Sequence, residues 1–263
     1  AKKLILYLRF DIGGWNGLGH ATRSIELAKE LKNKFNVIIC TNKLAKNFIK
    51  QKNFKYIYKK EEEKEERFLE RISKIKKNPI IFIDNNYEYK KKFLRKLNYK
   101  YKKIFFYQNF SSGIQKDNII FNPTPELNQS IHINKKFKVN KIYSGDKYLI
   151  IPKSIYYKKK KYLGISFGAS DPKNISLKLL KFLIKIKWKF PTFLFIGELS
   201  AFQKKIKKIK LPKNIKITKF DKKKLLKSCL AICSPGITAF ELLNNYIFGI
   251  YISHSKKHNN LGK

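Results

Sequence analysis

The chain has 263 residues, 43% of them hydrophobic, and a formal net charge of +42 at pH 7. That length is long for one domain and suits two domains of about 130 residues, each with enough apolar side chains to bury a core. No apolar run approaches the roughly 18 residues of a membrane span. The first apolar run is broken by Arg9 and Asp11, so it is typical of a strand and not of a signal peptide. We therefore expect a cytoplasmic protein, and the leading Ala1 suits a chain that has lost its initiator methionine.

Strand-like and helix-like patterns alternate along the whole chain. The first half predicts, in chain order, a strand at 4–10, a helix at 22–31, a strand at 36–40, a helix at 43–51, a strand at 56–58, a helix at 61–77, a strand at 79–84, a helix at 88–97, and strands at 104–107 and 119–121. After a connector at 143–161, the second half predicts a strand at 162–167, a helix at 174–186, strands at 192–196 and 215–218, a helix at 222–227, a strand at 230–233, a helix at 237–244 and a strand at 247–252. The alternation predicts an α/β protein with two Rossmann-like domains, at 1–146 and 147–263.

The large positive charge suggests a protein that binds nucleic acid or another polyanion. The composition favours a simpler reading, because only five of the 60 cationic residues are arginine, the residue that reads and stacks on bases. The lysines are spread over every predicted element and accompany an excess of Ile, Asn, Phe and Tyr, as A+T-rich codon usage would give. We expect no specific nucleic-acid partner, only weak attraction to anionic surfaces.

The three cysteines, Cys40, Cys229 and Cys233, form no CxxC pair. Free thiols in a reducing compartment are the default for such a pattern. The four histidines are scattered without metal-ligand spacing. We therefore expect neither a metal nor a cofactor.

A glycine-rich loop, Asp11-Ile-Gly-Gly-Trp-Asn-Gly-Leu-Gly-His20, joins the first strand to the first helix. Ligands of open α/β sheets bind at the carboxyl ends of strands, where glycines let the backbone approach them. A neutral His20 at the helix start is a candidate general base. The alternative is a histidine that only caps or packs. A dinucleotide site is disfavoured, because the spacing is not G-x-G-x-x-G and no acid ends the second strand.

Two loops of the second half are candidate phosphate sites. In the first, residues 166–174, Gly168 and Ser170 can offer donors to a phosphate at a helix N-terminus. The alternative there is a plain turn, with Ser170 or Asp171 capping the helix.

The second of these loops, residues 233–241, ends a strand, turns at Gly236 and begins a helix whose N-terminus can hold a diphosphate. Glu241 lies about one turn further on and can accept hydrogen bonds from the two hydroxyls of a ribose. The alternative for Glu241 is an exposed helix carboxylate.

Together these segments resemble the UDP-sugar hydrolases of pseudaminic acid biosynthesis, which cleave UDP-2,4-diacetamido-2,4,6-trideoxy-β-L-altropyranose. The resemblance begins with D-x8-H-x-x-R from Asp11 to Arg23, which includes Gly-Leu-Gly-His. It continues in the same order through residues 82–84, 144–148, 168–174 and 234–241. It implies the two-domain glycosyltransferase-B fold, which the lipid II-forming N-acetylglucosaminyltransferase shares.

The resemblance implies that His20 activates the water that displaces UDP with inversion, and that no metal takes part. The residues it implies for substrate binding are Asp11, Gly17, Gly19, Arg23, Asp84 and Tyr87 on the sugar side, and Gly168, Ser170, Asp171, Ser234, Gly236, Thr238 and Glu241 on the nucleotide side. Asn259, or its neighbour Asn260, is a candidate contact for either the diphosphate or the sugar.

This chain departs from the family pattern mostly in its sugar-facing half. The family's Asp-His-Tyr is here Asp84-Asn85-Asn86-Tyr87, its paired aspartates are replaced by Gln108-Asn109, and Ala169 takes the place of a glycine. The family also continues into a final helix beyond the position of Lys263, so we expect this chain either to be truncated or to lack that helix.

Three functions remain open from the sequence. The first is a hydrolase that releases UDP and a free acetamido sugar, acting as a monomer on a UDP-linked sugar. The second is a glycosyltransferase of the same fold, and the third is a nonenzymatic polyanion-binding protein.

Overall fold

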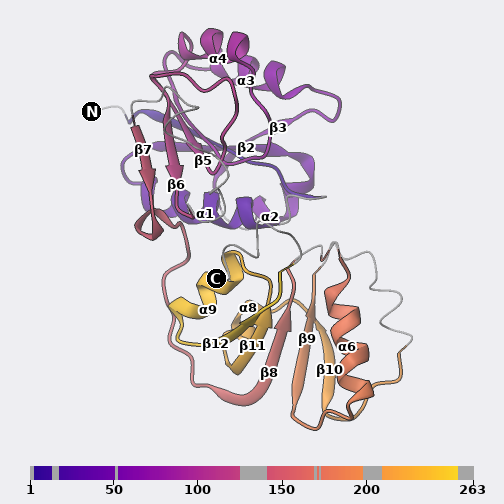
Figure 1. Ribbon diagram of the computed structural model, residues 1–263. Coiled ribbons are helices and arrows are strands. Elements are labelled where there is room, and N and C mark those ends of the chain that lie inside the picture. The colour runs from indigo at the N-terminus through magenta and orange to yellow at the C-terminus, as the bar shows by residue number, and fades with distance from the viewer. Residues whose placement is uncertain are drawn as a thin grey trace. The chain divides into compact units, whose positions relative to one another are not determined.

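The computed structural model describes residues 3–13, 18–50, 53–124, 141–168, 171, 173–197 and 209–253. The chain divides into two compact units (Figure 1). Unit 1 comprises residues 1–12 and 20–150, and unit 2 comprises residues 13–19 and 151–263. Each unit has its own sheet and core.

Unit 1 is built on a seven-stranded sheet in the order β3-β2-β1-β4-β5-β6-β7, in which every neighbouring pair is parallel. The strands are β1 (Ile5–Arg9), β2 (Asn36–Asn42), β3 (Lys55–Lys59), β4 (Ile80–Ile83), β5 (Lys103–Tyr107), β6 (Ile119–Asn122) and β7 (Lys141–Ser144). The central strands are nearly continuous runs of Ile, Leu, Phe and Tyr, as parallel strands covered on both faces require.

Helices cover both faces of this sheet (Figure 1). They are α1 (Gly19–Leu31), α2 (Lys46–Lys50), α3 (Glu65–Ser73) and α4 (Lys91–Asn98), with short 3₁₀ turns η2 (Lys43–Ala45) and η4 (Asp146–Tyr148). Apolar side chains of α3 and α4 pack in one core cluster with Tyr7, Ile81 and Ile83. Leu6 and Leu8, which alternate with Tyr7 along β1, are buried too.

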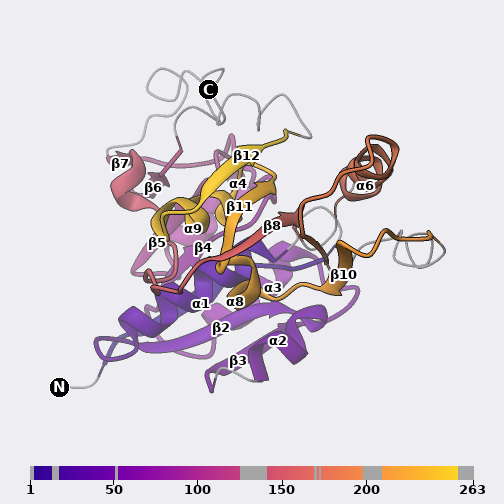
Figure 2. The ribbon, with the colours of Figure 1, turned by 90° about the horizontal axis from the view of Figure 1, so that it is seen from below.

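Unit 2 has a five-stranded parallel sheet in the order β10-β9-β8-β11-β12. Its strands are β8 (Lys160–Ser166), β9 (Thr192–Ile196), β10 (Ile215–Lys219), β11 (Ser228–Cys233) and β12 (Phe248–Tyr251), and its helices are α6 (Ile175–Lys185), α8 (Lys222–Leu225) and α9 (Ile237–Asn244). Ile232 packs in the cluster that contains α6, whereas its neighbours Ala231 and Cys233 pack in the cluster that contains α8 and α9. Because side chains alternate along a strand, α6 covers one face and α8 and α9 cover the other (Figure 2).

Both sheets reverse their strand order beside their first strand. In unit 1 the chain runs outward from β1 to β2 and β3, then returns to place β4 on the other side of β1. Unit 2 repeats this arrangement with β8 between β9 and β11. Open α/β sheets bind ligands in a crevice at the carboxyl ends of their strands. The crevice forms where two adjacent strands connect onward in opposite directions. These points follow β1 and β4 in unit 1, and β8 and β11 in unit 2.

The structure confirms the α/β class and most predicted elements, and several boundaries differ; for example, α1 begins at Gly19 and α3 ends at Ser73. Residues 141–144 are the edge strand β7, although the sequence placed part of them in a connector. The helix predicted from residue 61 begins at Glu65, because Lys60 and Glu63 form a turn in which the Lys60 amide donates to Glu63. The helix predicted from residue 88 begins at Lys91, and the Glu88 carboxylate binds Ser112 instead. Along the described part of the chain, no helix combines the length and apolarity needed to cross a bilayer.

Replacing Gly113 with alanine should destabilise unit 1 by about 1–3 kcal/mol. A Cβ atom there would lie 2.4 Å from Tyr89 O and 2.5 Å from Lys91 N, both backbone atoms that cannot rotate away. Urea unfolding of the variant measures the loss. Gly236→Ala is the matched control, because a Cβ at Gly236 meets nothing within 4 Å, and a Gly113→Ala midpoint no lower than that of the control would contradict the expectation.

Candidate functional site

The crevice of unit 1 places a buried carboxylate directly after β4. Arg9, the last residue of β1, pairs with Ile83, the last residue of β4, and the Asp84 amide donates to the Arg9 carbonyl at 2.8 Å. This hydrogen bond extends the pairing of β1 and β4 by one residue. Asp84 therefore lies at the end of the sheet, beside the loop that follows β1. The Asp84 side chain is fully buried.

His20 and Arg23 both bind this carboxylate from α1. His20 Nδ1 lies 2.6 Å from Asp84 Oδ1. Arg23 donates from Nε to Oδ2 at 2.9 Å and from Nη2 to Oδ1 at 2.7 Å, a bidentate contact. The two residues are three apart on one helix, so their side chains lie on the same face. The Arg23 guanidinium also lies 5.1 Å from the centre of the Tyr107 ring.

The partners of Asp84 keep it ionised. Burial opposes ionisation, but the charges and hydrogen bonds of Arg23 and His20 outweigh burial and lower the pKa of Asp84 to about 2. Two groups lie near His20 Nδ1: Asp84 Oδ1 at 2.6 Å and Arg23 Nη2 at 3.0 Å. Arg23 Nη2 makes its shorter bond to Asp84 Oδ1, at 2.7 Å, and an ionised carboxylate only accepts hydrogen bonds, so we place the ring proton on Nδ1. In a neutral imidazole Nε2 is then left with its lone pair, as a general base requires. The His20 side chain keeps 13% of its surface exposed.

The low pKa of Asp84 predicts a loss of stability in acid. Its folded pKa of about 2 lies below the ordinary value of 3.8, so this stabilisation is complete above about pH 4 and is lost as the pH falls toward 2. The contribution is on the order of 2 kcal/mol. Urea midpoints measured from about pH 6 to about pH 2 should fall more steeply for the natural chain than for Asp84→Asn. Parallel curves for the two proteins would contradict the assignment.

A second charge network lies behind the first, around the fully buried side chain of Arg9. Arg9 binds both Asp11 oxygens at 2.6 Å and both Glu65 oxygens, at 2.9 Å from Nε and 2.5 Å from Nη2. Burial opposes its charge, yet Glu65 and Asp11 raise the pKa of Arg9 well above its ordinary range. Glu65 Oε1 also accepts from Asn85 Nδ2 at 3.1 Å and Tyr89 OH at 2.8 Å. Asp11 is therefore held by Arg9, and its contact with a substrate stays a prediction.

The three residues after Asp84 have different neighbours. The buried Asn85 side chain binds Glu65 and Tyr89, whereas Asn86 Nδ2 lies 3.5 Å from His20 Nε2. Tyr87 is 40% exposed, and its carbonyl accepts from Asn109 at 2.9 Å. The side chain beside His20 Nε2 is therefore Asn86, which the sequence did not single out. The exchange of the family's Asp-His-Tyr for Asp-Asn-Asn-Tyr was the signal that pointed to this segment.

In unit 2, the loop after β8 contains a glycine turn and a capping carboxylate. Gly168 has φ +79°, a conformation that favours glycine, and no atom lies within 4 Å of where its Cβ would be. The Asp171 carboxylate accepts from the amides of Ile175 at 2.9 Å and Ser176 at 2.8 Å. Asp171 thus caps α6, which is the alternative that the sequence left open for it. Its contact with a phosphate stays a prediction.

The loop after β11 leads through Ser234 and Gly236 into α9, and Thr238 lies in the first turn. Glu241 is 6% exposed and its Oε1 accepts from Lys222 Nζ at 2.8 Å. The alternative reading of Glu241 as an exposed helix carboxylate is therefore wrong, and the Lys222 ammonium compensates the burial of its charge. Its role toward a ribose stays a prediction.

The structure thus groups the predicted residues by unit. Asp11, His20, Arg23 and Asp84 lie at the crevice of unit 1, whereas Gly19, the first residue of α1, is counted with unit 2. Gly168 and Ser234 follow the two strands that flank the crevice of unit 2. Gly17, Ser170 and Asn259 lie outside the described residues. Within the described ranges, no three His, Cys, Asp or Glu side chains come together as a metal would need.

No protein-family profile matches the chain. It is 32% identical over 257 aligned positions to the uncharacterized protein MJ1062 of Methanocaldococcus jannaschii, a match that covers 86% of this chain and 51% of the relative. The chain therefore spans about half the length of the curated relative it matches.

Solved structures resemble this chain over nearly its whole length. MurG of Acinetobacter baumannii has a TM-score of 0.58 and 13% identity over 99% of this chain and 82% of its own. UGT89C1 of Arabidopsis thaliana, solved with UDP, has a TM-score of 0.66 and 10% identity over 98% and 82%. HepE of Anabaena, solved with UDP and glucose, has a TM-score of 0.60 and 12% identity over 95% and 80%. The chain has the glycosyltransferase-B fold. At these identities the likeness shows the fold alone.

Proposed function

We propose that the chain is a nucleotide-sugar hydrolase that releases UDP and a free acetamido sugar. The observation that carries the proposal is the 2.6 Å contact between His20 Nδ1 and the ionised Asp84, which leaves His20 Nε2 as a base in the crevice of unit 1. A carboxylate that orients a histidine and stabilises its imidazolium is a recurrent catalytic arrangement.

In the proposed reaction, His20 Nε2 takes a proton from water as the water oxygen attacks the anomeric carbon. The bond from that carbon to the diphosphate oxygen breaks, UDP departs with the electron pair, and the configuration inverts. Asp84 stabilises the imidazolium, and Arg23 keeps the carboxylate in place through its two hydrogen bonds. Asn86 Nδ2, 3.5 Å from Nε2, is in reach of the same water.

The nucleotide is assigned to unit 2. Its two candidate loops follow the two strands that flank the crevice of the sheet, where phosphates meet backbone amides and a helix N-terminus. Proteins of the same fold solved with UDP support this choice of nucleotide. The domain at 1–146 then acts on the sugar and the domain at 147–263 holds UDP, with Glu241 on the ribose after exchange of its bond to Lys222.

A glycosyltransferase is the second candidate, because solved structures of the same fold include proteins named as glycosyltransferases. The same base would then deprotonate an acceptor hydroxyl in place of water. The acetamido-sugar hydrolase is favoured by the segment from Asp11 to Arg23, whose residues match the hydrolase motif.

One assay tests the proposal. The chain is incubated with UDP-linked acetamido sugars without an acceptor, and UDP and free sugar are followed by NMR. Release of both is expected, with the inverted anomer formed first. His20→Ala should lose most turnover but still bind UDP, whereas Lys29→Ala, on the exposed side of the same helix, should keep it. Release that needs an added acceptor would favour the transferase.

Binding of UDP is tested separately by the thermal unfolding midpoint. UDP that binds only the folded chain at about 100 times its Kd adds about 2.7 kcal/mol of stability. A thermal unfolding midpoint that UDP leaves unchanged but that rises with any polyanion would favour the polyanion-binding alternative.

A further inference from the structure

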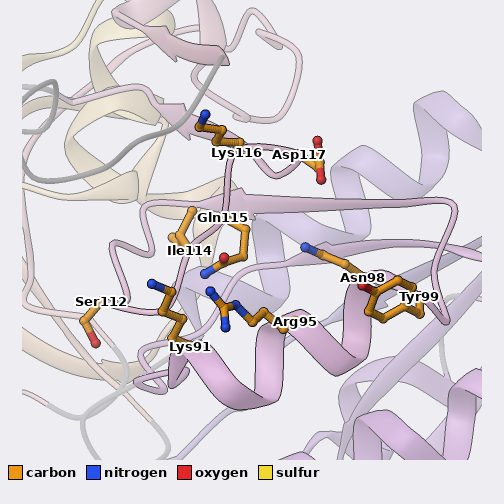
Figure 3. A pocket seen from close by; sticks show the side chains of 9 residues that line it. All are labelled: Lys91, Arg95, Asn98, Tyr99, Ser112, Ile114, Gln115, Lys116 and Asp117. Atoms are coloured by element: carbon orange, nitrogen blue, oxygen red, sulfur yellow. The ribbon is translucent and has the colours of Figure 1, made fainter.

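A separate cavity of about 810 Å³ lies on unit 1 between α4 and the segment that joins β5 to β6 (Figure 3). Such a volume is in the range of small-molecule sites, about 300–1,000 Å³. None of the residues assigned to the proposed reaction lines it. The lining residues are Lys91, Arg95, Asn98, Tyr99, Ser112, Ile114, Gln115, Lys116 and Asp117.

The cavity lining has an excess of positive charge, with Lys91, Arg95 and Lys116 against Asp117. Lys91 and Arg95 are four residues apart on α4, where like charges repel. Among the residues the structure describes, Arg95 has no carboxylate partner, unlike the three arginines at positions 9, 23 and 71. An anion in the cavity would relieve this repulsion.

Neutral donors face the same space, although Gln115 Nε2 already donates one hydrogen bond to the Gly113 carbonyl. Asn98 Oδ1 accepts from Asn118 Nδ2 at 2.8 Å, so the Asn98 amino group is the end that remains for the cavity. The ends of Arg95, Asn98 and Gln115 point toward one another (Figure 3). Guanidinium and amide N–H groups at one place suit the oxygens of a phosphate or carboxylate.

The walls of the cavity are fixed at both ends of α4. Near its start, the Gly113 amide donates to Tyr89 O at 3.0 Å, a close approach that a Cβ would prevent. Near its end, the buried Asn118 side chain donates to Asn98 Oδ1 and accepts from the Gln115 backbone amide. Asn98 and the backbone of Gln115 are therefore held in place before a ligand arrives, which lowers the entropic cost of binding, whereas Lys91 and Arg95 are exposed side chains.

We propose that this cavity binds a soluble small molecule with two or more phosphate or carboxylate groups. Arg95 and Lys91 hold the charged groups and Asn98 donates a neutral hydrogen bond. Tyr99, 89% exposed at the cavity, offers a ring face to a sugar or base attached to them. The site is independent of the proposed hydrolase, and it differs from the diffuse attraction of scattered lysines, which salt screens.

The test is an NMR titration of the ¹⁵N-labelled full chain with inorganic pyrophosphate at about 0.15 M salt. Saturable shifts are expected for the side-chain amides of Asn98 and Gln115. Arg95→Gln should weaken this binding by about tenfold, the loss expected for one charge-assisted contact. The control is Arg67→Gln, which removes an arginine on α3 that is exposed like Arg95 but does not line the cavity, and which should change the affinity by less than about twofold. A parallel titration with citrate decides between phosphate and carboxylate.

Shifts that do not saturate, or that weaken equally in both variants, would reduce the site to diffuse attraction and overturn the proposal. Repeating the titration with saturating UDP separates this cavity from the loops of unit 2. If UDP does not bind at all, the proposed hydrolase function is contradicted. The shifts of the Asn98 and Gln115 side-chain amides still decide whether the cavity binds pyrophosphate.

Discussion

Asp84→Asn should lower kcat for UDP-sugar hydrolysis by about 10³- to 10⁴-fold, because the asparagine amide can donate to His20 Nδ1 and move the ring proton to Nε2. The natural carboxylate accepts from Nδ1 at 2.6 Å and keeps Nε2 free. UDP affinity should stay within about twofold, since the nucleotide is assigned to the other unit. Steady-state kinetics and UDP titration measure the two quantities.

The ring nitrogens of His20 give a readout that does not depend on turnover. In ¹⁵N spectra the natural chain should show the proton on Nδ1, and Asp84→Asn should show it on Nε2. Glu26→Gln, which removes a carboxylate from the outer side of α1, is the control and should alter neither spectrum nor kcat. An Asp84→Asn enzyme with undiminished kcat would contradict the role of the pair.

Glu65→Leu and Arg9→Leu should each destabilise unit 1 by about 3–5 kcal/mol, because each leaves a buried charge without its principal partner. Glu65 is 5% exposed and accepts hydrogen bonds from Arg9, Asn85 and Tyr89, so its removal leaves donors of all three unpaired. Urea unfolding measures the loss.

The double variant Arg9→Leu/Glu65→Leu should be more stable than the sum of the single losses predicts, since two apolar side chains replace both charges at once. The exposed pair Glu26–Lys29 is the matched comparison, and breaking it should cost at most about 1 kcal/mol. Losses for the buried pair as small as those for the exposed pair would show that Arg9 and Glu65 contribute no more than surface charges.

The sequence predicted the layered architecture because continuous apolar runs and helical periodicities can be recognised without knowing which residues are in contact. Residues 80–83 and 230–233 were predicted as strands for this reason, and both are strands in the structure. The edge strand at 141–144 was missed because its residues, Lys-Ile-Tyr-Ser, have no such run, and pairing with β6 makes it a strand.

The site was predicted only in part. The loop that bears His20 follows from the rule that ligands bind after parallel strands, but its pairing with Asp84 joins residues 64 positions apart. That contact depends on β4 lying beside β1 in one register, which no local pattern encodes. The same holds for Arg9 and Glu65, which are 56 positions apart. Whether the candidate residues of either unit contact a substrate stays a prediction.

The burial of Arg9 in the first strand bears on the order in which unit 1 can form during synthesis. A ribosome adds about 5–20 residues per second, so β1 emerges several seconds before its carboxylate partner on α3 and longer still before β4. Until α3 emerges, closing the sheet over Arg9 would leave its guanidinium without Glu65. A nascent chain that ends before residue 65 should therefore remain open at β1 and protease-sensitive there, and protection should begin only once α3 and β4 have left the exit tunnel.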